Sequence, residues 1–250
     1  MRSRKIEVPN ILPDTLLFML DDTGHETLAG DHTVYGLAGI ALRASHNEPQ
    51  LWPAWRNLRA LVNGDPDTPI HALEFGQEAR KRPELYSPLG DFFREHRFVR
   101  LAVTATVKTS LPDHLVLMQP VILILKKYMA DVAARSDCGS VAVVFESSER
   151  ADDALTQHFG NLIVERNGSN IPVEHCLMEK KNHEPALEVA DFVANAAGSM
   201  ARWRVEGKNG FPKDFASIFH SVPARFGRYI DIGSVCGEEQ NELMFFHELR

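Results

Sequence analysis

The sequence predicts an α/β protein in which a mixed β-sheet is flanked by helices. The runs Thr15–Leu20 and Ser140–Phe145 are continuously apolar, which is typical of strands that are buried on both faces of a sheet. Longer segments between such runs, including Pro112–Arg135, carry apolar residues at helical spacing. Strands that alternate with helices indicate a sheet with helices packed against it.

The individual elements follow from the same patterns. We expect strands at 15–20, 33–42, 98–107, 140–145 and 171–178, and helices at 49–62, 88–96, 112–135, 152–166, 185–203 and 238–249. Asn63-Gly64-Asp65-Pro66 ends the first helix, and Pro185 suits the first position of the helix that it opens. The short segment Ile70–Phe75 is assigned no element.

The chain of 250 residues fits a single domain, which we place at 1–250, with a core at about 15–205 and a C-terminal extension at about 206–250. A domain of this size buries most of its chain surface, so it does not need disulfide bonds or structural metal ions to be stable. The three cysteines form no C-x-x-C pair, which argues against a disulfide scaffold and a structural zinc site. A reducing cytoplasm is the simplest setting, so we expect a cytoplasmic protein.

Charge and hydropathy narrow the set of partners. The apolar runs are too short to span a membrane, so we expect no membrane partner. The net charge of −7 does not attract nucleic acid over long distances. Basic residues do cluster locally, at Arg80-Lys81-Arg82 and Lys126-Lys127, and a solvated helix face is their simplest interpretation.

Three acidic residues occupy positions where an acid is unusual. Asp21 and Glu146 directly follow the two buried strands, and Asp191 lies inside a helix that is apolar almost all round. A buried carboxylate is unfavourable unless it is paired or bound to a metal ion. Asp191 could therefore cap a loop, pair with an arginine or bind a metal.

The same three acids suit one chemistry if they converge. Ligand chemistry in α/β sheets gathers at strand ends, and oxygen donors suit Mg²⁺ or Mn²⁺. Two such ions, about 3.5–4 Å apart, can activate a water molecule and stabilise the leaving oxygen in phosphodiester hydrolysis. The acids therefore predict a metal-dependent phosphodiesterase.

Two ordered motifs resemble the domain of unknown function 3800 family. The sequence FMLDDTG at 18–24 resembles the first-strand motif f-i-D-E-S-G of that family, and LEVADFVA at 187–194 resembles its motif L-Q-x-A-D-l-v-a. Between them, the strand 141–145 with its terminal acid and the pair His71-x-x-Glu74 occupy the expected places. The resemblance covers roughly residues 15–200 in order.

The resemblance implies a ribonuclease H-like fold and a nuclease that acts on DNA or RNA with Mg²⁺ or Mn²⁺ as its cofactor. On the basis of this resemblance, we expect Asp21, Glu146 and Asp191 to be metal ligands. Glu74 becomes a fourth ligand or an orienting acid, and His71 becomes a candidate proton carrier.

The sequence departs from the family pattern at four positions. Asp22 and Thr23 replace Glu and Ser conservatively. Glu188 replaces Gln and adds a charge one turn from Asp191. Glu146 stands where the pattern leads us to expect Asp, and Glu149 is an alternative third ligand.

Two other functional classes stay open. Asp22-Thr23-Gly24 after an apolar strand also matches the aspartic-protease signature, with Asp231-Ile232-Gly233-Ser234 as a degenerate second copy, although the halves lack symmetry. Asp22 itself would point to the opposite side of the strand from Asp21. The second alternative is a non-catalytic ribonuclease H-like interaction protein, which Glu146 and the acidic net charge favour.

Overall fold

The computed structural model describes residues 11–24, 28–29, 32–96, 98–108, 115–147, 152–178, 183–207, 227–234 and 243–246. Its strands are β1 (Thr15–Thr23), β2 (Leu28–Ala29), β3 (His32–Arg43), β4 (Val99–Lys108), β5 (Ser140–Glu146), β6 (Val164–Arg166), β7 (Ser169–Ile171), β8 (Val173–Met178), β9 (Gly227–Ser234) and β10 (Leu243–Phe246). Its helices are α1 (Ala44–His46), α2 (Trp52–Asn63), α3 (Ala72–Lys81), α4 (Tyr86–Glu95), α5 (Leu115–Arg135), α6 (Asp152–Phe159) and α7 (Pro185–Val205). None of these described helices is both long and apolar enough to cross a membrane.

The main sheet has eight strands, in the order β10-β9-β4-β3-β1-β5-β8, with β2 paired to β3. Strands β1, β3 and β4 form an antiparallel meander, whereas β5 lies parallel to β1 and β8 lies parallel to β5. Beyond β4, β9 pairs parallel with β4 and β10 pairs antiparallel with β9. The sheet is therefore mixed, as the sequence predicts.

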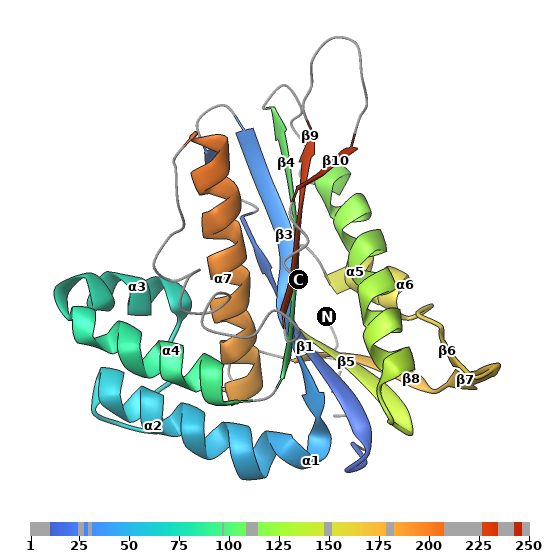
Figure 1. The fold of residues 1–250 in the computed structure, drawn as a ribbon, viewed down its shortest axis with the longest axis horizontal. Helices are drawn as coiled ribbons and strands as arrows, with labels where there is room; N and C mark the ends of the chain where they lie inside the picture. Colours follow the sequence, from blue (N-terminus) through green and yellow to red (C-terminus); the bar gives the residue numbers. More distant parts are fainter. Residues whose placement is uncertain are drawn as a thin grey trace, which may run out of the picture.

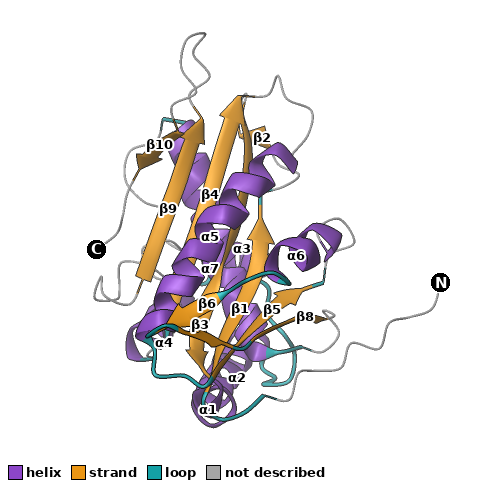
Figure 2. Ribbon diagram, turned by 90° about the vertical axis from the view of Figure 1, so that its right-hand side faces the viewer, coloured by secondary structure: helices purple, strands orange, loops and turns teal. Residues whose placement is uncertain are grey.

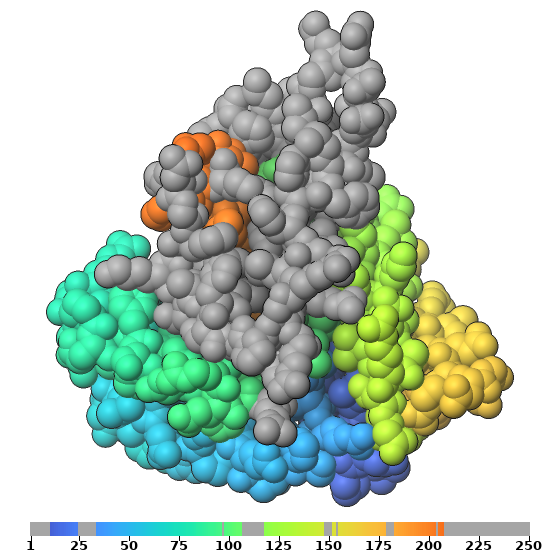
Figure 3. All heavy atoms as spheres, viewed as in Figure 1, coloured from blue at the N-terminus to red at the C-terminus, as the bar shows by residue number. Residues whose placement is uncertain are grey.

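Helices cover both faces of this sheet. Figure 1 shows α7 with α2, α3 and α4 on one side, and α5 with α6 on the other. Figure 2, turned by 90°, shows α5 lying across the strands. In the space-filling view, α2 to α4 form the surface of one flank and α5 borders the other (Figure 3).

Strand β1 lies at the centre and is buried on both faces. Leu17 and Met19 belong to the hydrophobic core on the α7 side, and Leu16, Phe18 and Leu20 belong to the core on the α5 side. Alternate side chains of a strand point to opposite faces, so the continuous apolar run supplies both cores.

Helix α7 is apolar all round because it is covered on two sides. It packs against β1, β3 and β4, and also against α2 and α3. Small side chains let it approach the sheet closely: a Cβ atom built at Gly198 would lie 2.3 Å from Thr23 Oγ1. Helix α7 therefore lies directly against the carboxyl end of β1.

Two expected elements are shorter than predicted. The helix expected at 152–166 stops at Phe159, and residues 164–166 instead form β6, which pairs with β7 across a two-residue turn at Asn167 and Gly168, with positive φ angles of 54° and 77°. The strand expected at 171–178 is interrupted at Pro172, which has no N–H to donate, so β8 begins at Val173.

Three further expectations need correction. The helix expected at 238–249 is wrong at 243–246, where the apolar strand β10 pairs with β9, and the rest of that segment lies outside the described residues. The helix expected at 49–62 becomes α-helical only at Trp52, after a π-helical turn. In the unassigned segment, α3 begins at Ala72 because Ala72, Phe75 and Ala79 bury one helical stripe.

Two glycines provide a matched test of this packing. A Cβ atom at Gly39 in β3 would lie 1.9 Å from the carbonyl oxygen of Met19, whereas nothing lies within 4 Å of one at Gly76 in α3. We expect Gly39→Ala to lower the free energy of unfolding by about 1–3 kcal/mol or more, because β1 and β3 must move apart. Gly76→Ala should raise it by about 0.5–1 kcal/mol, because alanine restricts the unfolded chain. Urea unfolding measures both values, and an unchanged Gly39→Ala protein would contradict the β1–β3 packing.

Candidate functional site

Asp21 and Glu146 are neighbours at the carboxyl ends of two adjacent strands. The parallel register pairs Leu20 with Phe145, so the next residue on each strand is an acid. By strand alternation both acids follow Met19 and Val144 onto the face that α7 covers. Strand β1 runs two residues beyond Asp21 rather than ending before it.

Asp191 is the third acid, and it reaches this face from α7. Its side chain is 28% exposed, although the helix around it is buried. The charges of Asp191 and Glu146 both act on Asp21, which places the three acids in one electrostatic cluster. Asp21 and Asp191 therefore lie on the same side of the sheet, as expected.

The charge of Asp21 is unfavourable in the folded protein. Burial holds the pKa of Asp21 well above its ordinary value, and the negative charges of Asp191, Glu146 and Asp22 raise it further. The backbone N–H of Asp22 donates to Asp21 Oδ1 over 2.8 Å and offsets only part of this effect. A group that relieves this repulsion would stabilise the fold.

Asp191 also has a structural contact. Its Oδ2 atom accepts a hydrogen bond of 2.8 Å from the backbone N–H of Ala72, the first residue of α3. The carboxylate thus caps the start of that helix, where a negative charge is favourable. Capping was one of the ordinary explanations that the sequence left open for Asp191.

His71 and Glu74 lie beside Asp191 at the start of α3. His71 Nδ1 is 3.8 Å from Asp191 Oδ2, and its side chain is 48% exposed. The interaction with Asp191 is the largest effect on the pKa of His71 and raises it; burial opposes this, and the charges of Glu74 and Glu146 add to it. Glu74 is exposed in the first turn of α3, so these two residues form the rim of the acidic cluster.

Glu188 is not the additional site charge that the motif suggested. It is buried and forms an ion pair with Arg59 of α2, which is also buried. Glu188 Oε2 further accepts hydrogen bonds from Trp55 Nε1 at 2.9 Å and from the backbone N–H of Ile70 at 3.2 Å. Its charge is compensated within the protein, one helical turn before Asp191.

Asp22 faces the opposite side of the sheet from Asp21, as strand alternation predicts. Tyr35 of β3 lies in the core on that side, and its buried hydroxyl makes no hydrogen bond to any of the described residues. Burial raises the pKa of Tyr35, and the charges of Asp22 and then Asp21 raise it further. This hydroxyl is a feature that sequence patterns did not identify.

The acids do not form a ready-made metal cage. Within the described residues, no three His, Cys, Asp or Glu side chains are grouped closely enough to hold a metal ion. The hydrogen bonds leave Asp21 Oδ2 and Asp191 Oδ1 without a donor from the described part of the chain. Glu149, the alternative third ligand, lies outside the described residues.

The aspartic-protease alternative is wrong. Asp231 lies on β9, whereas Asp21 lies on β1, three strands away across β4 and β3. At about 4.8 Å per strand, their backbones are roughly 14 Å apart, which is too far for two acids to share a proton. The mixed, helix-flanked sheet also differs from an all-β protease.

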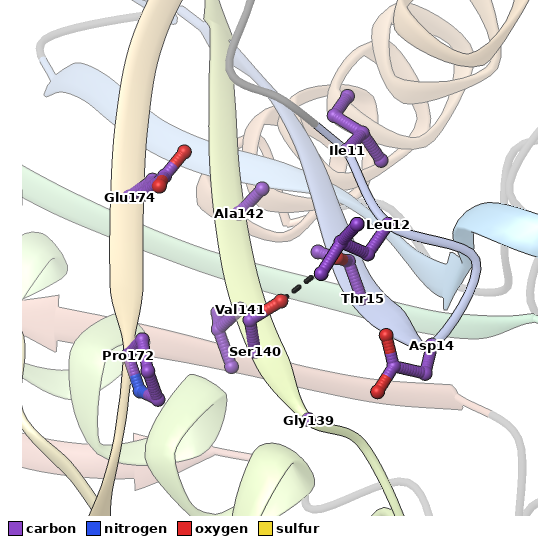
Figure 4. A pocket seen from close by; sticks show the side chains of 10 residues that line it. All are labelled: Ile11, Leu12, Asp14, Thr15, Gly139, Ser140, Val141, Ala142, Pro172 and Glu174. Atoms are coloured by element: carbon purple, nitrogen blue, oxygen red, sulfur yellow. Dashed lines mark hydrogen bonds between the residues drawn. The ribbon is translucent and has the colours of Figure 1, made fainter.

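A pocket with a volume of about 280 Å³ lies at the other end of the central strands. Figure 4 shows it between the starts of β1 and β5, with Thr15 Oγ1 and Ser140 Oγ hydrogen-bonded at 2.8 Å. Asp14 and Glu174 contribute its acidic groups. None of the predicted site residues lines this pocket, so it is separate from the acidic cluster.

No protein-family model matches the sequence, and a search of curated proteins found no match either. Among solved structures, the chain is similar to one in the "Structure of the PCNA:RNase HII complex from Archaeoglobus fulgidus", with 12% sequence identity and a TM-score of 0.34 over 79% of this chain and 82% of that one. The fold class rests on the strand order and the two helical layers rather than on this similarity. They confirm the expected α/β class, a mixed sheet flanked by helices.

The pKa of Asp21 predicts a pH-dependent stability. Because the folded-state pKa is raised, the contribution of Asp21 to stability is fully present below its ordinary pKa of 3.8 and is lost as pH rises through the folded-state value. Asp21→Asn removes the repulsion, so in EDTA at neutral pH the variant should be more stable than the wild type. This difference should vanish at about pH 3–4.

Urea unfolding across this pH range measures the effect. Glu165→Gln, at the exposed position of β6, removes one negative charge away from the cluster and serves as the control. A constant difference between Asp21→Asn and the wild type at all pH values would show that the cluster does not act on Asp21.

Proposed function

We propose that this protein is a divalent-metal-dependent nuclease that hydrolyses phosphodiester bonds at the acidic cluster. The observation that carries the proposal is the convergence of Asp21, Glu146 and Asp191, from β1, β5 and α7, on one face of the sheet. The motifs at 18–24 and 187–194, which contain Asp21 and Asp191 and resemble the domain of unknown function 3800 family, also support it. We propose membership of that family on the same residues.

The donor set fits Mg²⁺ or Mn²⁺ in its chemistry. All three acids offer oxygen atoms, which these ions prefer, and the mutual repulsion at Asp21 is what a cation would relieve. Asp21 Oδ2 and Asp191 Oδ1 are available as ligands, while the other oxygen of each is held by a backbone N–H. The described residues do not form a cage, so the acids would have to come closer together to share one ion.

The residues of the chain then have distinct roles. The three acids would hold the metal, whose chemistry is to activate water and stabilise the leaving oxygen. Glu74 is a fourth ligand or an orienting acid beside His71. His71 is partly exposed, and the neighbouring Asp191 raises the pKa of His71, so this residue is the candidate to carry a proton to a leaving oxygen at the rim.

Nuclease assays test this proposal directly. Purified protein should cleave single- or double-stranded DNA or RNA with Mg²⁺ or Mn²⁺ and stop with EDTA. Asp21→Asn should lower kcat by at least about 10²–10³-fold, because one ligand oxygen loses its charge. Glu165→Gln is the matched control and should retain activity. Cleavage that survives chelation or the Asp21→Asn change would rule out the mechanism.

A second candidate function is a non-catalytic interaction protein with the same fold. Two observations favour it: the acids form no cage among the described residues, and Asp191 already has a capping role. Such a protein would bind a metal ion or no ion at all, and would not turn over substrate.

Thermal melting separates metal binding from a purely structural role of Asp191. A ligand that binds only the folded state raises the Tm by mass action, so Mn²⁺ should raise the Tm of the wild type. Asp191→Asn keeps an oxygen that can accept from Ala72 N–H, so the metal-free variant should be at least as stable as the wild type, and its Mn²⁺ shift should shrink. A large loss of stability in the variant, without any metal response in the wild type, would favour the structural role.

A further inference from the structure

The segment Ile70-His71-Ala72 is attached to α7 at two points. Ile70 N–H donates to Glu188 Oε2 over 3.2 Å, and Ala72 N–H donates to Asp191 Oδ2 over 2.8 Å. Ile70 and Ala72 are buried, whereas His71 between them is exposed, with extended backbone angles (φ −101°, ψ 142°). Two acids on successive turns of one helix therefore determine where His71 and the start of α3 lie.

Glu188 is held more firmly than Asp191. Its two oxygens accept from Trp55 Nε1, from two nitrogens of Arg59 and from Ile70 N–H. Arg59 Nη2 also donates to the carbonyl oxygen of His183 at 3.0 Å, just before α7. Since Glu188 is 7% exposed and all its hydrogen bonds go to protein groups, it has no access to substrate or metal.

We propose that Glu188 is a positioning residue for the acidic cluster. Through Ile70 it holds the segment against α7, so that Ala72 N–H meets Asp191 and His71 stands beside the same carboxylate. Without this anchor, the Ala72–Asp191 hydrogen bond and the place of His71 would depend on Asp191 alone. The expected effect on catalysis rests on the proposed function. The anchoring of Ile70 by Glu188 does not depend on that function.

The test compares two double variants that both remove the buried charge pair. Arg59→Met with Glu188→Gln leaves an amide oxygen that can accept from Ile70 N–H. Arg59→Met with Glu188→Leu leaves no acceptor. Replacing both partners avoids an uncompensated buried charge, which a single substitution would create. Ile70→Pro removes the same donor from the other end while keeping Arg59 and Glu188, in case the leucine variant fails to fold.

Amide hydrogen exchange, followed by NMR, distinguishes loss of a local anchor at Ala72 from a general loss of stability, which would also raise exchange in α7. Exchange at Ala72 should rise about 10-fold or more in the leucine variant and in Ile70→Pro, although Asp191 is unchanged. It should stay near the wild-type rate in the glutamine variant. Exchange at Val193, in the middle of α7, should be the same in all of them. Unchanged protection of Ala72 in the leucine variant, or in Ile70→Pro if that variant alone folds, would overturn the proposal.

Kinetics supply the second readout. Loss of the anchor should lower kcat about 10–100-fold with little change in KM, and the glutamine variant should recover most of it. A leucine variant with wild-type kcat would overturn the positioning role. If the wild-type protein shows no nuclease activity, the proposed function fails, and the exchange at Ala72 still decides whether Glu188 is the anchor.

Discussion

Helix α7 must bury almost its whole circumference, and this requirement organises the site around it. The helix lies between the sheet and helices α2 to α4, so each polar group that it carries needs a partner from another element. Glu188 finds Arg59 of α2, and Asp191 finds the N–H of Ala72 in α3. These two acids thereby join the outer helices to the sheet.

At the carboxyl ends of β1 and β5, by contrast, acidic side chains lie close together and repel one another. Parallel pairing sets Asp21 beside Glu146, and the close approach of α7 adds Asp191. Packing alone would favour neutral residues at all three positions, because like charges in a partly buried place destabilise the folded state. Proteins keep such groups mainly where they serve a function, which is the physical basis for regarding this end of the sheet as the site.

Patterns within the chain were enough for the central strands of the sheet and for the acids at the carboxyl ends of β1 and β5, but not for β9 and β10 at its edge. Continuous apolar runs predicted β1 and β5, and strand alternation predicted that Asp21 and Asp22 diverge. The pairing of Arg59 with Glu188 lay beyond such patterns, since the partners are 129 residues apart and meet only through tertiary packing. A signal was present nonetheless: each is a charged residue on the apolar side of its helix. Helix α3 was missed because it is short and depends on α7 for its burial.

The place of β1 at the centre of the sheet also affects how the chain is made. Its β3 partner follows shortly after it, but Thr15 and Ser140, which are hydrogen-bonded, are 125 residues apart. At ribosomal rates this separation leaves one edge of β1 unpaired for on the order of 10 s. An apolar strand with an open edge is a template for pairing with other chains. In the folded protein, β3 and β5 pair with both edges of β1. Before β5 has been made, Leu16–Leu20 is therefore more prone to aggregation than it is in the folded protein.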